Sequence, residues 1–79
     1  MEYIALFFTH SGAIKYDKFL KEKGLKSTLT PVPRKLTSNC GVGTIFEYNG
    51  NPSGIISEDI DKLFSIEKRE YSLIYSSEE

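Results

Sequence analysis

The sequence lacks a second cysteine, and this shortage narrows the chemistry that it can support. Cys40 is the only cysteine among 79 residues. One thiol cannot form an internal disulfide, and one thiol alone cannot hold a zinc ion. We therefore expect no metal site and no cofactor. An unpaired thiol also suits a reducing compartment, so we expect a cytoplasmic protein.

Long apolar segments and an excess of charge of one sign are missing as well. The apolar run near the N-terminus is about six residues long, far short of the ~20 that a membrane span needs, and no positive segment precedes it. Ten basic and eleven acidic residues give a net charge of −1, which leaves no global attraction for nucleic acid. We expect neither a membrane nor a nucleic acid as a partner.

The residues that are present suffice for one small domain over residues 1–79. This size is near the lower limit at which a core forms without disulfides or metal ions. The hydrophobic share is 39%, with five tyrosines and five phenylalanines, so the core must rely on aromatic side chains.

Secondary-structure signals predict the order β-α-β-β-α-β. Strands are expected at residues 3–8, 25–30, 41–48 and 70–75. A helix is expected at residues 12–23, because Ala13, Tyr16, Phe19 and Leu20 share one face and Gly24 follows as a C-terminal cap.

A second, shorter helix is expected at residues 57–64. Acidic residues occupy its first turn, and its buried side would consist of Ile56, Ile60, Leu63 and Phe64. The complete pattern is that of the ferredoxin-like, split β-α-β-β-α-β fold of the α+β class. Right-handed crossovers then give a four-stranded antiparallel sheet in the order 4-1-3-2, with both helices on one face.

Cys40 is the leading candidate for a functional residue. Ser38, Asn39 and Gly41 flank it and indicate a loop, so we expect an accessible thiol. In the expected fold, the first and third strands are adjacent and antiparallel, which brings Cys40 beside His10 at the start of the first helix. A helix N-terminus carries a partial positive charge, and this charge favours a thiolate.

Each candidate residue also has a simpler interpretation. His10 either activates the thiol or merely caps the turn between strand and helix. Arg34 and Lys35 either hold an anionic group next to Cys40 or are ordinary solvated loop charges. Cys40 itself is either a reactive thiol or a small buried hydrophobic residue.

The motifs Thr9-His10, Pro31-Val32-Pro33-Arg34 and Ser38-Asn39-Cys40-Gly41-Val42 resemble those of a small bacterial family of selenium/sulfur (Se/S) carrier-like proteins. The resemblance covers residues 3–75, and Asn39 departs from the serine expected there. It implies that Cys40 is the carrier thiol, with Arg34 and His10 as neighbours. It also implies sulfur or selenium donor and acceptor proteins as partners.

Three functions are compatible with these residues. The favoured one is a carrier, rather than a catalyst, that holds sulfur or selenium on Cys40 as a persulfide or selenosulfide. The alternative is a non-catalytic module that binds a small ligand or another protein. A thiol enzyme that uses Cys40 and His10 ranks last, because no third orienting group is apparent. The oligomeric state is expected to be a monomer or a homodimer, since an edge strand could pair with a second copy.

Overall fold

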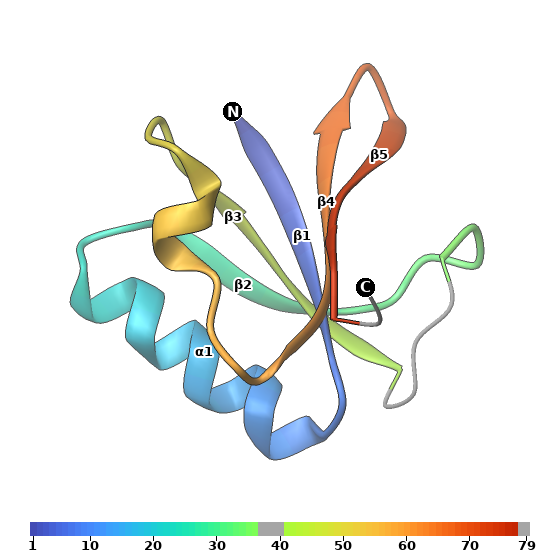
Figure 1. Ribbon diagram of the computed structural model, residues 1–79. Coiled ribbons are helices and arrows are strands. Elements are labelled where there is room, and N and C mark those ends of the chain that lie inside the picture. The colour runs from blue at the N-terminus through green and yellow to red at the C-terminus, as the bar shows by residue number, and fades with distance from the viewer. Residues whose placement is uncertain (37–40, 78–79) are drawn as a thin grey trace.

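The computed structural model describes residues 1–36 and 41–77. It contains one antiparallel sheet in the order β2-β3-β1-β4-β5 and a helix that covers one of its faces (Figure 1). The elements are β1 (Glu2–Phe7), α1 (His10–Glu22), β2 (Ser27–Pro31), β3 (Val42–Glu47), the short 3-10 helix η1 (Pro52–Ile55), β4 (Ile60–Glu67) and β5 (Glu70–Ser76).

The expected ferredoxin-like fold is therefore wrong. The second helix does not form at residues 57–64; the chain runs into β4, which pairs with β1 on one side and β5 on the other. The sheet thus has five strands, and β4 takes the place beside β1 that was expected for the last strand. A helix of eight residues has little stability of its own, whereas a central strand has backbone partners on both sides.

Strand β1 is the centre of the molecule. Its apolar residues are at most 3% exposed, and they are Tyr3, Ile4, Ala5, Leu6 and Phe7. Because successive side chains of a strand point to opposite faces, alternate residues of β1 pack on opposite sides of the sheet. Tyr3, Ala5 and Phe7 belong to the core under α1. Ile4 and Leu6 therefore face the side without the helix.

Helix α1 has well-defined ends. Thr9 is the N-cap, and its hydroxyl accepts a hydrogen bond of 3.0 Å from the amide of Gly12. At the other end, the amides of Gly24 and Leu25 donate to the carbonyls of Lys21 and Leu20, which is the Schellman arrangement. Gly24 has a φ of +80°, a left-handed conformation that glycine adopts without strain.

The core between α1 and the sheet is aromatic, as the composition suggests. Tyr16 lies between Phe7 and Phe46, with ring centroids 5.4 and 5.9 Å away. The Tyr16 hydroxyl donates a buried hydrogen bond of 2.6 Å to the carbonyl of Ile55 in η1, which lies on the same side of the sheet as α1 (Figure 1). Phe19 was expected in this core, but it is 37% exposed and contacts Tyr16 at the border.

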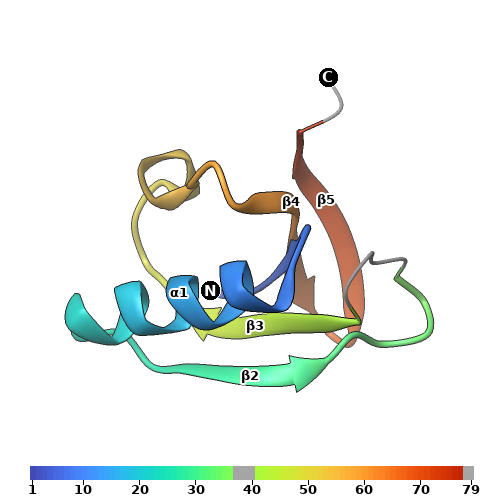
Figure 2. The ribbon, with the colours of Figure 1, turned by 90° about the horizontal axis from the view of Figure 1, so that it is seen from below.

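The residues that follow β2, 32–36, run to the opposite face of the sheet (green in Figure 1). Figure 2 shows them beside β5. A turn forms where the amide of Leu36 donates to the carbonyl of Pro33. Leu36 then lines a hollow together with Phe64 and Tyr71, so the turn meets the β4–β5 hairpin.

Candidate functional site

The end of β1 and the start of β3 lie at the same edge of the sheet. Leu6 of β1 pairs with Gly43 of β3 in antiparallel register, so Phe7 and Val42 follow at this edge. The chain then enters α1 at His10, directly after the Thr9 cap. The beginning of β3 and the beginning of α1 are therefore neighbours, although more than thirty residues separate them in the sequence.

The chain enters β3 through a fixed backbone geometry. The amide of Val32 donates a hydrogen bond of 3.0 Å to the carbonyl of Gly41, which continues the pairing of Pro31 with Val42. Gly41 has a φ of +72°, so a side chain at this position would be strained. The residues just before it, Ser38, Asn39 and Cys40, were predicted as part of the site and lie outside the described residues.

A largely apolar hollow of about 340 Å³ opens at this edge, and we call it the edge hollow. It brings His10 together with Val42. The expected proximity of His10 and Cys40 stays a prediction, because Cys40 lies outside the described residues. The lining of the edge hollow consists of His10, Ile14, Leu29, Thr30, Pro31 and Val42. Ile14 is 58% exposed and Leu29 is 38% exposed, so both leave apolar area open to solvent. This lining therefore offers an apolar contact surface.

Beside the edge hollow, the N-terminal tip of α1 is tightly packed. Gly12 is buried, and a β-carbon at this position would lie 3.2 Å from the hydroxyl of Thr9 and 3.4 Å from Asp59. Lys15 forms an ion pair of 3.4 Å with the same Asp59. These contacts fix the orientation of the helix tip relative to the sheet.

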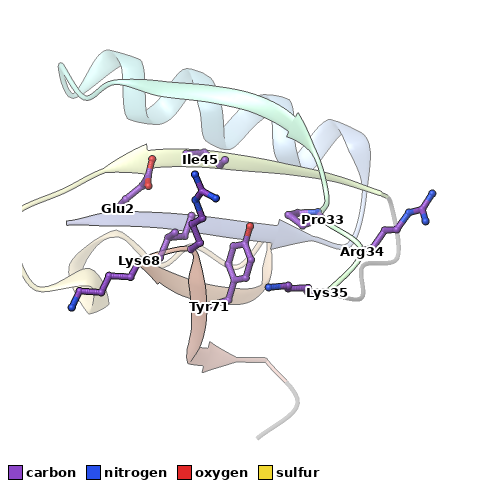
Figure 3. Close-up of a pocket in the computed structure, with 9 residues that line it drawn as sticks. Glu2, Pro33, Arg34, Lys35, Ile45, Lys68 and Tyr71 are labelled. Atoms are coloured by element: carbon purple, nitrogen blue, oxygen red, sulfur yellow. The ribbon is translucent and has the colours of Figure 1, made fainter.

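Arg34 and Lys35 do not line the edge hollow. Both are exposed in the turn after β2, and they line a second hollow of about 530 Å³, which we call the basic hollow (Figure 3). Its floor includes Ile45, which alternates with the helix-facing Phe46, so the hollow is on the face opposite α1. The structure therefore assigns His10 and the Arg34-Lys35 pair to different hollows.

Lys68 and Arg69 also line the basic hollow, and sequence reasoning did not find them. They occupy the two-residue turn between β4 and β5, where Glu67 pairs with Glu70. Such turns usually carry Asn-Gly, a signal that this sequence lacks. Alternating apolar residues on both sides of the pair were the signal that could have revealed the hairpin.

A comparison with known protein families identifies the family of this chain. A family model described as "Putative Se/S carrier protein-like" matches residues 2–53. The chain belongs to this family. The matched residues include β1, α1, β2 and β3, together with the connection that contains Cys40. The match ends before β4, so it does not include Lys68 and Arg69.

Other comparisons with known proteins yielded nothing for this family member, since no curated protein and no solved structure matches the chain. Within residues 1–36 and 41–77, no three His, Cys, Asp or Glu side chains gather in a way that could hold a metal ion. In the same part of the chain, α1 is too short and too polar to cross a membrane.

Proposed function

We propose that this protein carries sulfur or selenium on Cys40 and passes it between partner proteins. Membership of the Se/S carrier family supports sulfur or selenium as the cargo. The location is supported by one observation above all, the pairing of β1 with β3. Cys40 directly precedes Gly41, and the described residues after Gly41 lie at the sheet edge where α1 begins.

The proposed step is a displacement at sulfur. The Cys40 thiolate attacks the outer sulfur of a persulfide on the donor protein, so a new S–S bond forms and the donor's S–S bond breaks. The electron pair leaves on the donor thiolate, which takes up the proton released by Cys40. Because a zero-valent sulfur atom moves from one thiol to another, the step needs no further oxidant or reductant. Selenium would follow the same route.

The neighbours of this edge support a reactive thiol. A helix N-terminus and a nearby imidazole both favour the thiolate over the thiol, and α1 with His10 offers both. Gly41 provides the backbone turn into β3, and Ser38 and Asn39 are polar residues that precede Cys40 in the sequence. The edge hollow, lined by His10 and Val42, offers apolar contact area for a partner protein.

Intact-mass spectrometry tests the proposal directly. The protein is incubated with a cysteine desulfurase that carries a persulfide, and we expect its mass to increase by one sulfur atom. The increase should disappear on treatment with a reductant, because a persulfide is reducible. The matched control is Cys40→Ser, which keeps the loop composition and removes only the thiol. An equal increase in Cys40→Ser, or none in the natural protein, would refute the proposal.

A non-catalytic binding module is the second candidate, and the apolar edge hollow supports it. The two functions predict different reactivities of the Cys40 thiol. A carrier thiol at this edge should react with iodoacetamide with an apparent pKa below the ordinary ~8.5, because the helix tip stabilises the thiolate. His10→Gln should slow that reaction. A rate profile centred at the ordinary value and unchanged in His10→Gln favours the binding module.

A further inference from the structure

Positive charge is concentrated at the basic hollow. Four cationic side chains line it, from the β2–β3 connection and from the β4–β5 turn, and they are Arg34, Lys35, Lys68 and Arg69. Among the described residues that line it, Glu2 is the only carboxylate. The lining therefore carries an excess of positive charge, whereas the whole chain has a net charge of −1.

Other carboxylates lie near the basic hollow. Glu47 pairs with Glu2 and alternates with the helix-facing Phe46, so it is on the same face of the sheet as the hollow. Ile66 and Tyr71 pair with each other and line the basic hollow. Glu67 and Glu70 are the next pair of the hairpin, and neither lines the basic hollow. Both line a separate hollow with Lys68 and Ser72. Glu70 also borders the neighbouring hollow that contains Lys35. These carboxylates reduce the positive potential of the basic hollow, but the residues that line it remain in positive excess.

The turn that supplies two of the cations is strained. Lys68 and Arg69 have φ angles of 52° and 68°, a left-handed conformation that is unfavourable for side chains other than glycine, asparagine and aspartate. Positive φ angles at both central residues are what a two-residue type I′ hairpin turn requires. The hairpin therefore holds Lys68 and Arg69 together at its tip, beside the basic hollow.

The shape and lining of the basic hollow favour a peptide over the other anionic ligands. Its floor and wall present Ile45, Ile66 and the ring of Tyr71 between the charges, so both acidic and apolar side chains have partners there. Lys35 points toward the ring of Tyr71, whereas Arg34 and Lys68 extend outward at the rim (Figure 3). A volume of about 530 Å³ exceeds what one phosphate group fills. Single-stranded nucleic acid uses several aromatic stacking surfaces, and the lining has only the ring of Tyr71.

We propose that the basic hollow docks an acidic segment of the protein that donates sulfur or selenium to this chain or accepts it. This proposal rests on the carrier function proposed above. Lys35 belongs to the same connection between β2 and β3 as Cys40, so a segment bound at Lys35 is held by the connection that carries the thiol. Long-range attraction between unlike charges would also speed the encounter of the two proteins.

Titration with a fluorescent hexaglutamate peptide tests the docking surface on the full chain. We expect binding that weakens as salt is added, since the contacts are exposed ion pairs. Lys35→Gln/Arg69→Gln should weaken it roughly 3- to 30-fold, given the usual contribution of exposed ion pairs. The matched control is Lys18→Gln/Lys23→Gln, which removes the same charge from α1 and its C-cap on the opposite side of the sheet. This control should bind within about twofold of the natural protein.

Four outcomes overturn the proposal: no binding to the natural protein, equal weakening in the control, inorganic phosphate that displaces the peptide at equal concentration, or tighter binding of oligouridylate at the same salt. Cys40→Ser is titrated in parallel and should bind as the natural protein does. Peptide binding needs no thiol, and sulfur loading is measured by mass. Failure of the docking surface and failure of the carrier function therefore give different results.

Discussion

At the scale of single residues, Tyr16 is the polar group on which the core depends most. Its ring is 2% exposed, and its hydroxyl donates to the carbonyl of Ile55, thirty-nine residues further along the chain. Burial, and to a lesser degree the charge of Tyr48, raises the pKa of Tyr16 far above its ordinary value. The hydrogen bond therefore ties η1 to α1 with a group that stays neutral.

Tyr16→Phe should lower the free energy of unfolding by about 1–3 kcal/mol, because it leaves a buried carbonyl without its donor. Tyr3→Phe is the matched control, since the Tyr3 hydroxyl meets only the sulfur of Met1 at 3.5 Å. It should cost under about 1 kcal/mol, because sulfur is a weak acceptor. Urea denaturation of both variants measures the difference, and equal losses would contradict this role of Tyr16.

A second residue-scale prediction concerns acid. Burial by itself would raise the pKa of Asp17, but hydrogen bonds from Ser27 at 2.6 Å and Lys21 at 2.9 Å, with the charge of Lys21, lower it. A depressed carboxyl pKa contributes stability that is present at neutral pH and is lost as the pH falls below about 4.

Ser27→Ala should therefore reduce stability at neutral pH by about 1 kcal/mol and make the loss on acidification shallower. Ser72→Ala, at an exposed position of β5, is the control. Denaturation curves at neutral and acidic pH measure both effects. An unchanged acid dependence in Ser27→Ala would show that Asp17 is not the group that titrates.

At the scale of elements, the turn of the β4–β5 hairpin has two cationic residues where asparagine and glycine would be more stable. The turn holds Lys68 and Arg69 in left-handed conformations. Lys68→Asn/Arg69→Gly fits this turn better and should raise the free energy of unfolding by roughly 1–2 kcal/mol. The same variant should bind the acidic peptide more weakly, by a factor similar to that expected for Lys35→Gln/Arg69→Gln, because two of the four cations are gone.

The control for the hairpin is Lys68→Gln/Arg69→Gln, which removes the charge and keeps the strained conformation. It should bind as weakly, without the gain in stability. Thermal unfolding and peptide titration on the same two samples distinguish the effects. A stabilised variant that binds as before would mean that the turn has no part in docking.

Another element-scale prediction concerns the pairing that forms the candidate site. A β-carbon on Gly43 would lie 2.8 Å from the carbonyl oxygen of Ala5, which is closer than packed atoms allow. Gly43→Ala should therefore push β3 from β1 and cost about 1–3 kcal/mol. Gly54→Ala, where no atom lies within 4 Å, should change little. Equal effects of both changes would contradict the close approach of the strands.

Sequence patterns predicted β1 and α1, which have strong local signals. They predicted a helix where β4 forms. The apolar run of β1 and the cap at Gly24 match the structure closely. The spacing of Ile60, Leu63 and Phe64 fits a helix, and only pairing with β1 and β5 selects the strand. The turn at Lys68-Arg69 lacks the usual Asn-Gly signal, so only the alternating apolar residues on both sides of it could have indicated this hairpin and its half of the basic hollow.

At the scale of the whole molecule, the sheet separates two surfaces. The edge hollow, with His10 and Val42, opens where α1 begins, and the basic hollow lies on the face without the helix. The connection between β2 and β3 joins the two surfaces, because Pro31 lines one and Pro33 the other. This arrangement suits a carrier whose docking contacts and reacting atom are distinct.

Transfer of radioactive sulfur through the chain tests the central claim most directly. A labelled persulfide donor is mixed with the protein, the donor is removed, and an acceptor thiol is added. The carrier function predicts label on the peptide that contains Cys40, followed by its release to the acceptor. Label on any other residue, or label on Cys40 that no acceptor thiol can remove, would contradict it.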